Sequence, residues 1–391
     1  MAPQSQAPMT LQGITLPNLA VDPGNFFRFT RRQRVSFQSA KAITGLGSTD
    51  RVKILQDGIL GKLYLRVYGT HTWGGTITGS TCSWKWPYGV VSNCKLTANG
   101  QSGLISLDGT QLKLVEVIMN PENRGPVSRS IGSATGVTSG TLSLPHESWG
   151  VSGSNQMGPG VTVPATGAYT YALTWEIPVA FDDKTLIGAI FAQTSATDIE
   201  LEITWETQAN MFTVGGSASL TSTYSFEVLG EFYSIPNVGG TLVVPELFSY
   251  HGLVASNLAG ISSGEVEHTL PGTGVGKQLM RLIGQVQDTN VPLAVNSTNY
   301  GKVGWRYGAN TTPEDIPAQF LNAINVQDYG ENLGLYWGYW VHDFAHESAF
   351  RDSIDESTVT SLRNVANLAS APSSGKMYSI QQTLFSAAAG S

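Results

Sequence analysis

Two histidines and two carboxylates follow one another closely near the C-terminal end, in the order His-Asp-Phe-Ala-His-Glu. They are His342, Asp343, His346 and Glu347. On a helix, residues 342 and 346 would present two imidazoles on one face, as zinc sites require. The segment directly follows the aromatic run 335–341, however, and an extended chain would hold the two rings too far apart to share one ion. The pattern therefore favours polar residues at a strand end, and no metal site is predicted.

A glycine-rich stretch at 271–278 is superficially similar to a phosphate-binding loop. Its sequence is Pro-Gly-Thr-Gly-Val-Gly-Lys-Gln. Pro271 stands where such a loop needs its first glycine, and Gln278 stands where it needs the hydroxyl that binds magnesium. The stretch is therefore interpreted as a flexible turn between strands, and no cofactor is predicted.

Three glutamates, Glu200, Glu202 and Glu206, are the remaining acid–base candidates. Neighbouring like charges raise a carboxyl pKa when they are buried. These glutamates, however, alternate with apolar residues over 199–205, so their face of the strand is expected to lie in solvent. The alternative is that this face meets cations of a neighbouring subunit.

The two cysteines, Cys82 and Cys94, are too few for a disulfide framework in a chain of 391 residues. They flank a predicted turn at 84–89 and could face one another across a hairpin, but two free thiols are the preferred interpretation. Neither has a histidine close in sequence, and no Gly-x-Ser-x-Gly motif precedes a helix. No catalytic residues are predicted, and we expect no enzymatic activity.

Basic and aromatic residues are interleaved over 26–34, in the order Phe-Phe-Arg-Phe-Thr-Arg-Arg-Gln-Arg. The candidate contact residues of the chain are its four arginines, Arg28, Arg31, Arg32 and Arg34. Such a segment could lie on an anionic lipid surface or on an acidic partner. Alternatively, it is a strand whose arginines pair with carboxylates of the same protein. The formal net charge of −7 argues against a nucleic-acid partner, which requires a concentrated basic surface.

The elements that position these residues are clearest between 169 and 207. Apolar residues alternate with polar ones over 169–177 and again over 199–205, which predicts two strands with one buried face each. Between them, Asp182 is a possible helix cap, and Leu186, Ala189 and Ile190 form an apolar stripe. A short helix is therefore predicted at 181–190.

Further strands are predicted at 63–67, 112–117, 224–228, 279–286, 335–341 and 377–385. A second helix is predicted near Ile316, with Ile316, Phe320, Ala323 and Ile324 on one face and Asp315 as its cap. Pro317 is tolerable there only in the first turn. Successive strands without crossover helices favour antiparallel sandwiches over a parallel sheet, and jelly rolls suit this length best.

The chain is long enough for two domains, because single cores seldom grow past about 250 residues. Residues 1–24 are predicted to be a flexible N-terminal arm. Residues 25–236 are predicted to form the first jelly roll, with a long surface loop at 124–167, and 237–391 the second, with a C-terminal tail. The Pro-Asn-Val-Gly-Gly sequence at 236–240 marks the boundary.

Composition supports a protein with large covered surfaces. Charged residues make up only 13% of the chain, against about 25% in an average soluble domain. Glycine, serine, threonine and aromatic residues take their place, which suits short strands, tight turns and surfaces covered by neighbouring subunits. No signal peptide and no run of about 18 apolar residues is present, so we expect a soluble protein made in the cytoplasm.

The order of these elements resembles that of a known family. The local match is Leu-Thr-Trp-Glu-Ile-Pro-Val-Ala-Phe at 173–181, Thr-Leu-Ile-Gly-Ala-Ile at 185–190 and the strand 200–205. A closing strand, a Pro/Gly connection, the run 242–245, a helix near Ile316 and aromatic strands then follow. The chain resembles the double jelly-roll major capsid proteins of tectivirus-like phages, which are tailless and enclose a membrane and whose lineage includes the adenovirus hexon.

The resemblance implies an all-β fold of two tandem eight-stranded jelly rolls, with short helices inserted between late strands of each. It implies a structural protein that assembles as a pseudo-hexagonal homotrimer and tiles an icosahedral virion over an internal membrane. Its partners would be copies of itself and minor capsid or vertex proteins. The N-terminal arm would face the interior, where Arg28, Arg31, Arg32 and Arg34 would contact the membrane or a minor protein.

Two other classes stay open. A carbohydrate-binding or carbohydrate-active jelly roll would use exposed tryptophans, for which the candidates are Trp73, Trp84, Trp86, Trp149 and Trp337. A minor vertex or receptor-binding virion protein would be pentameric or fibrous, whereas a major capsid protein should be a trimer.

Overall fold

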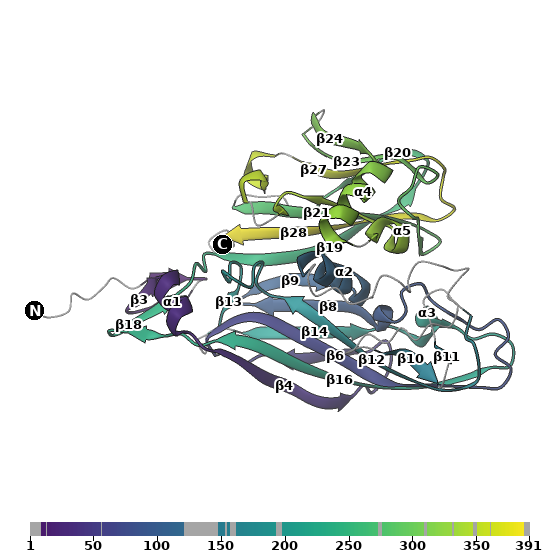
Figure 1. Ribbon diagram of the computed structural model, residues 1–391, viewed down its shortest axis with the longest axis horizontal. Coiled ribbons are helices and arrows are strands. Elements are labelled where there is room, and N and C mark those ends of the chain that lie inside the picture. The colour runs from purple at the N-terminus through teal and green to yellow at the C-terminus, as the bar shows by residue number, and fades with distance from the viewer. Residues whose placement is uncertain are drawn as a thin grey trace, which may run out of the picture.

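The computed structural model describes residues 9–12, 14–55, 57–120, 148–152, 155–156, 162–192, 198–272, 276–308, 311–330, 332–346, 350–359 and 361–386. Two β-sandwiches lie one above the other in Figure 1, with the N-terminal strands and α1 projecting at one end. The lower sandwich contains the first half of the chain and the upper sandwich the second half.

The first sandwich consists of two four-stranded sheets that enclose one core. One sheet has the order β12-β6-β16-β4 and the other β9-β8-β14-β5. Their bounds are β4 (Arg32–Ala42), β5 (Thr49–Lys53), β6 (Ile59–Gly74), β8 (Val91–Ala98), β9 (Gln101–Leu107), β12 (Gly167–Pro178), β14 (Ile199–Trp205) and β16 (Ser219–Tyr233). Three short strands, β10 (Ser148–Ser152), β11 (Asn155–Gln156) and β13 (Ile190–Phe191), extend the first sheet.

The second sandwich repeats this plan. Its sheets have the orders β25-β21-β28-β19 and β20-β27-β23-β24. Their bounds are β19 (Ser249–Ile261), β20 (Gly264–Thr269), β21 (Lys277–Asp288), β23 (Tyr300–Tyr307), β24 (Thr311–Pro317), β25 (Tyr339–Asp343), β27 (Leu362–Leu368) and β28 (Gly375–Ser386). In both sandwiches the first, eighth, third and sixth strands form one sheet and the other four form the second. This is the arrangement of a jelly roll.

The two sandwiches share one sheet. β19 pairs in parallel with β9, at Leu253–Ile105 and Val254–Ser106, and so joins a sheet of each sandwich into a single ten-stranded sheet. The other ladders within both sandwiches are antiparallel, as the strand patterns predict.

The strands predicted at 169–177 and 199–205 are confirmed as β12 and β14. Leu173, Trp175 and Ile177 are fully buried, and alternate residues on the same strand are partly exposed. Burial of each such side chain contributes roughly 1.5–3 kcal/mol. Trp175 Nε1 also donates a hydrogen bond of 2.8 Å to the carbonyl of Gly109, so its one polar atom is satisfied in the core.

The strand predicted at 112–117 is wrong: these residues belong to helix α2 (Gly109–Met119). Asp108 caps the helix by accepting from the Gln111 N–H at 2.8 Å, and the Gln111 side chain accepts from the Asp108 N–H at 3.0 Å. This capping box fixes the first turn. Because α2 is buried on nearly all sides, its residues show no polar face, and the apolar run was misread as a strand.

The helix predicted at 181–190 is also wrong: residues 182–188 form consecutive turns, and Ile190 begins β13. Asp182 caps these turns, accepting from the Lys184 N–H and the Thr185 hydroxyl. Leu186 and Gly188 have φ of 59° and 81°, and this left-handed backbone ends any helix. The predicted apolar stripe is nevertheless buried.

The helix predicted near Ile316 is confirmed as α4 (Ala318–Tyr329), which begins directly after Pro317. Asp315 is not its cap, since Pro317 occupies that position. The strand predicted at 335–341 is confirmed only from Tyr339, where β25 begins. Residues Leu333–Trp337 form α5, and Gly338, with φ of 69°, separates this helix from β25.

Residues 1–24 are expected to be a flexible arm, but residues 9–12 and 14–24 contain strands and the start of α1; residues 1–8 and 13 lie outside the described part. A hairpin of β1 (Met9–Leu11) and β2 (Ile14–Leu16) precedes β3 (Leu19–Val21). β3 pairs in parallel with β18 (Thr241–Val244), which in turn pairs with β17 (Asn237–Val238). Leu11 and Leu19 are buried beside Val244, so apolar burial fixes this segment. Most of the predicted loop at 124–167 lies outside the described residues.

Candidate contact surface

The interleaved aromatic and basic segment begins as helix α1 (Pro23–Phe29). Asp22 caps it by accepting from the Asn25 N–H at 3.0 Å, and Pro23 supplies the fixed φ that suits a first turn. Phe26 is fully buried in the cluster formed with β3 and β18. The Thr30 hydroxyl then donates to the carbonyl of Ser234 at 2.7 Å and ends the helix against the close of β16.

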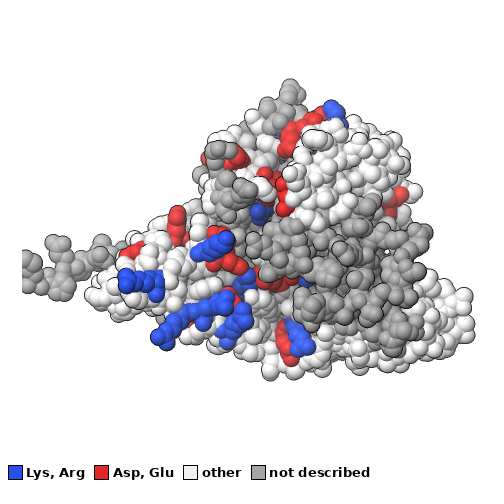
Figure 2. All heavy atoms as spheres, viewed as in Figure 1, with Lys and Arg blue, Asp and Glu red and all other residues white. Residues whose placement is uncertain are grey.

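The other side of α1 faces outward. Phe27 and Phe29 are 40% and 48% exposed, and the Arg28 guanidinium lies 5.2 Å from the centre of the Phe29 ring. Arg28 and Arg31 are exposed, and neither forms an ion pair with any residue that the structure describes. These four side chains are named here the α1 patch. Figure 2 shows Lys and Arg side chains gathered at this end of the molecule.

Arg32 and Arg34 lie on β4 and have a partner within the chain. Arg34 Nε lies 3.1 Å and Arg32 Nη1 3.7 Å from the carboxylate of Glu231 on the neighbouring strand β16. The hydrogen bond to Glu231 raises the pKa of Arg34 above its ordinary value. The predicted cluster therefore divides in two: Arg32 and Arg34 pair within the sheet, as the alternative interpretation expected, whereas Arg28 and Arg31 do not.

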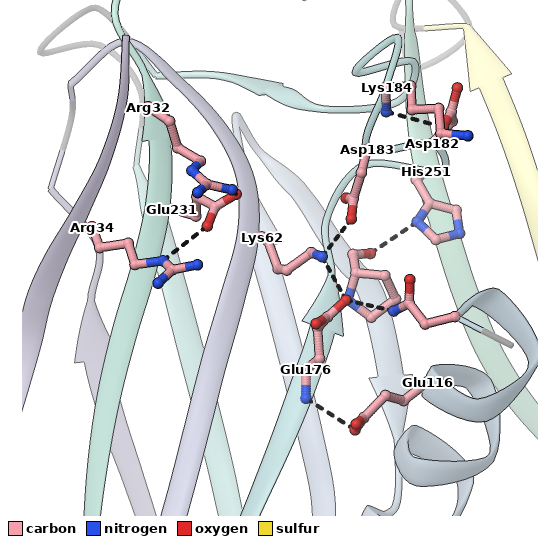
Figure 3. Close-up of polar contacts among 12 residues, drawn as sticks. Arg32, Arg34, Lys62, Glu116, Glu176, Asp182, Asp183, Lys184, Glu231 and His251 are labelled. Carbon is pink, nitrogen blue, oxygen red and sulfur yellow. Dashed lines mark hydrogen bonds and ion pairs between the residues drawn. The ribbon is translucent and has the colours of Figure 1, made fainter. Parts of the chain in front are cut away.

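A second, more deeply placed ion-pair group continues across the same sheet face (Figure 3). Lys62 on β6 pairs with Glu176 on β12 at 2.6 Å and also with Asp183. Burial alone would lower the pKa of Lys62, but its hydrogen bonds to Asp183 and Glu176 raise it above its usual range. Glu176 also accepts from the Asn120 side chain at 2.7 Å. We call Lys62, Glu176 and Asp183 the β6 ion-pair group.

Sequence reasoning missed the β6 ion-pair group because its members are far apart in the chain. Lys62 and Asp183 are separated by 121 positions, and only the pairing of β6 with β12 brings them together. The one signal was a lysine in an otherwise apolar run, Ile59-Leu60-Gly61-Lys62-Leu63. A buried charge requires a partner.

The residues of the metal candidate have separate partners. His342 is fully buried, with Nδ1 3.1 Å from Glu314, whereas His346 is exposed and lies 3.9 Å from Asp328. Asp343 pairs with Arg281 at 2.7 Å, and Glu347 lies outside the described residues. Over the described ranges, no group of three or more His, Cys, Asp or Glu side chains could hold a metal ion.

The glutamates of β14 have the neighbours expected of a partly solvated face. Glu200 and Glu202 lie 3.7 Å and 2.8 Å from the Arg51 side chain of β5. The glycine-rich stretch at 271–278 is only partly described, and its Lys277 donates to the carbonyl of Gly272.

Cys82 and Cys94 are both buried free thiols, as preferred from the sequence. Burial raises the pKa of each to about 12, which makes them unreactive near neutral pH.

The tryptophans proposed for carbohydrate stacking are mostly enclosed. Trp73, Trp86 and Trp337 are between 1% and 5% exposed, so their ring faces are occupied by the protein itself. Trp86 packs against Tyr171 and Phe212 within the first sandwich. In the described part of the chain, no helix is long and apolar enough to cross a membrane.

Comparison with solved structures finds this fold in viral capsid proteins. The chain is similar to the STIV MCP, from Sulfolobus turreted icosahedral virus, with a TM-score of 0.64 and 16% identity over 91% of this chain and 97% of that chain. It is similar to the PBCV-1 virus capsid, with a TM-score of 0.58 and 10% identity over 90% and 93% of the two chains. It is also similar to the Faustovirus major capsid protein, with a TM-score of 0.53 and 10% identity over 91% of this chain and 90% of that chain.

No protein-family model and no curated protein sequence matches the chain. The likeness is therefore one of architecture, and it extends over nearly the whole of each chain. Together with the strand orders of the two sandwiches, it establishes that the chain has the all-β double jelly-roll fold found in these viral capsid proteins.

Proposed function

We propose that this chain is a structural capsid protein that assembles with copies of itself into an icosahedral viral shell. The observation that carries the proposal is the fusion of two jelly rolls through one sheet, matched over about nine tenths of the chain by capsid proteins of several viruses. No catalytic role and no direct contact with nucleic acid form part of the proposal.

The proposed assembly unit is a homotrimer. Each chain brings two similar sandwiches, so three copies place six sandwiches in a ring and give a pseudo-hexagonal outline that fills a plane without gaps. Light scattering should give a particle of three 41.7 kDa chains, and negative-stain images should show the hexagonal outline. A protein that stays monomeric at high concentration would contradict the proposal, and a pentamer or fibre would favour a vertex protein instead.

The α1 patch is the proposed contact with an internal membrane. Exposed aromatic rings beside cations suit the boundary between lipid headgroups and acyl chains. Phe27 and Phe29 supply the rings, and Arg28 and Arg31 supply charges that no described carboxylate neutralises. Arg32 and Arg34 lie beside the patch and remain more than half exposed. They would add a weaker contribution, because each shares its charge with Glu231.

Flotation with phosphatidylserine-rich vesicles tests the membrane contact. The double variant Arg28→Gln/Arg31→Gln should lose most binding, since each basic residue near such a surface contributes about 1 kcal/mol. The control Arg66→Gln/Lys302→Gln removes the same charge from residues that are 51% and 53% exposed but already paired, and it should bind normally. Equal loss in both variants would indicate a general charge effect, and no loss in either would refute the contact. Binding to an acidic virion protein instead of vesicles would identify a minor protein as the partner.

A further inference from the structure

The two sandwiches carry their helices at equivalent places. Helix α2 lies between β9 and β12 in the chain, and α4 lies between β24 and β25. α2 packs on β12 and β8, and α4 packs on β25 and β23, which are the corresponding strands of the two jelly rolls. A surface that contacts the outward side of α2 therefore has an equivalent position next to α4.

Helix α2 has no free side because the second sandwich covers it. The outer face of the sheet β25-β21-β28-β19 lies against it, and Ile283, Val341 and Ile380 of that face are at most 1% exposed. They belong to the same apolar cluster as residues of α2. Gln382 Nε2 lies 3.3 Å from the sulfur of Met119 at the end of the helix. Within one chain, then, the side of the first sandwich that carries α2 is covered by the outer face of a sheet of the second sandwich.

Helix α4 occupies the place of α2 in the second sandwich, but within the described residues no sheet face covers its outward side. Its buried residues, Ala318, Leu321, Asn325 and Tyr329, face its own sandwich at helical spacing. Asn325 accepts from the Val341 N–H and donates to the Val341 carbonyl, both at 2.9 Å. The opposite side carries Phe320, which is 60% exposed, and the exposed Ala323. Of the apolar face predicted from the sequence, Phe320 and Ala323 are thus outward, whereas Ile316 precedes the helix and packs against the core of the second sandwich.

The first sandwich has the matching sheet face, and none of the helices that the structure describes lies on it. The outward residues of β6 include Tyr64, Arg66 and Tyr68, and Leu229 lies on β16 in register with Tyr64. Tyr64, Tyr68 and Leu229 are half-buried, and Arg66 pairs with Glu227 at 3.2 Å. This face is equivalent to the sheet face that covers α2. It mixes apolar and charged residues, which suits a surface that must stay soluble before assembly.

We propose that α4 of one copy docks, through Phe320, on the outer face of β6 and β16 in the next copy. The contact repeats between chains the helix-on-sheet interface that each chain already contains. Because it joins unlike surfaces, it is a heterologous interface, and such an interface produces a ring when the rotation closes. The inference rests on the proposed self-assembly and names the surfaces that carry it.

The first test replaces the exposed phenylalanine. Phe320→Glu should weaken association at least thirtyfold in a dilution series followed by mass photometry, since a central aromatic anchor contributes about 2 kcal/mol or more. The matched control is Val291→Glu, because Val291 is 55% exposed on the two-residue strand β22 (Val291–Pro292), which pairs with the end of β21; it should associate like the wild type. Normal association of Phe320→Glu would overturn the inference while the proposed function stands. A wild-type chain that does not associate would overturn the function.

A second test identifies the partner surface directly. A Phe320→Cys chain is mixed with a Leu229→Cys chain and oxidised, and a Phe320→Cys chain is mixed with a Tyr68→Cys chain in parallel. A disulfide-linked pair that forms in either mixture, but not with each variant alone, supports the contact. Cys82 and Cys94 are buried and do not compete. Association without a cross-link in either mixture would place the interface elsewhere and refute the docking.

Discussion

The sheet β25-β21-β28-β19 of the second sandwich and the sheet β12-β6-β16-β4 of the first occupy the same place in their jelly rolls, yet their outer faces differ. The first-named face is sealed: Leu253, Ile283 and Ile380 are at most 1% exposed, and the Arg281–Asp343 ion pair on this face is nearly buried as well. The other face carries half-buried tyrosines and the exposed ion pair Arg66–Glu227. A face that is always covered within the chain can be built as a core. One that meets solvent before it meets a partner must keep exposed charges.

Truncating one apolar side chain on each face should give the largest difference in the free energy of unfolding. Ile380→Ala removes buried methyl groups from the sealed face and should lower the free energy of unfolding by about 2–4 kcal/mol. Leu229→Ala on the open face should cost less than about 1 kcal/mol in the dissociated chain, because its side chain already meets solvent. Urea unfolding at low protein concentration measures both. Equal losses would mean that the open face is packed as tightly as the sealed one.

Lys62 and Arg66 are both cations on the outward side of β6. Their substitution should give a smaller difference in the free energy of unfolding than the truncations do. The Lys62 side chain is 10% exposed between two carboxylates, whereas Arg66 is 51% exposed beside one. Lys62→Met leaves Glu176 without its cation in a half-buried site and should cost about 2 kcal/mol. Arg66→Met should cost about 0.5 kcal/mol or less. If Arg66→Met lowers the free energy of unfolding more than Lys62→Met does, burial does not decide the strength of these two ion pairs.

Acid should loosen the sealed face through His251. Its Nδ1 donates to the Pro178 carbonyl at 2.9 Å, and its Nε2 accepts from the Gln382 amide at 2.9 Å. Burial lowers the pKa of His251 to about 4. Because the folded pKa lies below the ordinary value of 6.5, the stabilisation is complete above pH 6.5 and is lost as the pH falls towards 4.

We expect a loss of roughly 1–2 kcal/mol between pH 7 and pH 5 from this residue. The variant His251→Gln should remove that part of the pH dependence, as measured by urea unfolding at several pH values. His71 in the first core has a pKa lowered to about 3 by burial, so an acid effect of similar or slightly larger size should persist in the variant. An unchanged pH profile would show that His251 does not titrate with folding.

The sequence predicted best those elements with one buried and one open face. β12 and β14 alternate clearly, because each has a core side and a solvent side. Helix α2 was missed since both sandwiches bury it and no polar stripe is left to reveal its period. The turns at 182–188 share composition with a helix, but Leu186 and Gly188 adopt a left-handed backbone, which spacing does not show.

The sequence predicted which residues form the contact surface, but not which of its arginines form ion pairs within the chain. The arginine cluster at 28–34 was visible as a run of letters, whereas its division depends on Glu231, about 200 positions away. The β6 ion-pair group depends in the same way on strand pairing across the sheet. Register between distant strands decides these contacts, and a single sequence does not contain it.

The parallel pairing of β9 with β19 also has a mechanical consequence. Two sandwiches that share one hydrogen-bonded sheet and a helix packed between them form a stiff plate, because a hinge at the junction would require breaking backbone hydrogen bonds. In the proposed shell, curvature would then be taken up along the borders between copies. The same chain could enclose volumes of different size by changing only the angles at those borders.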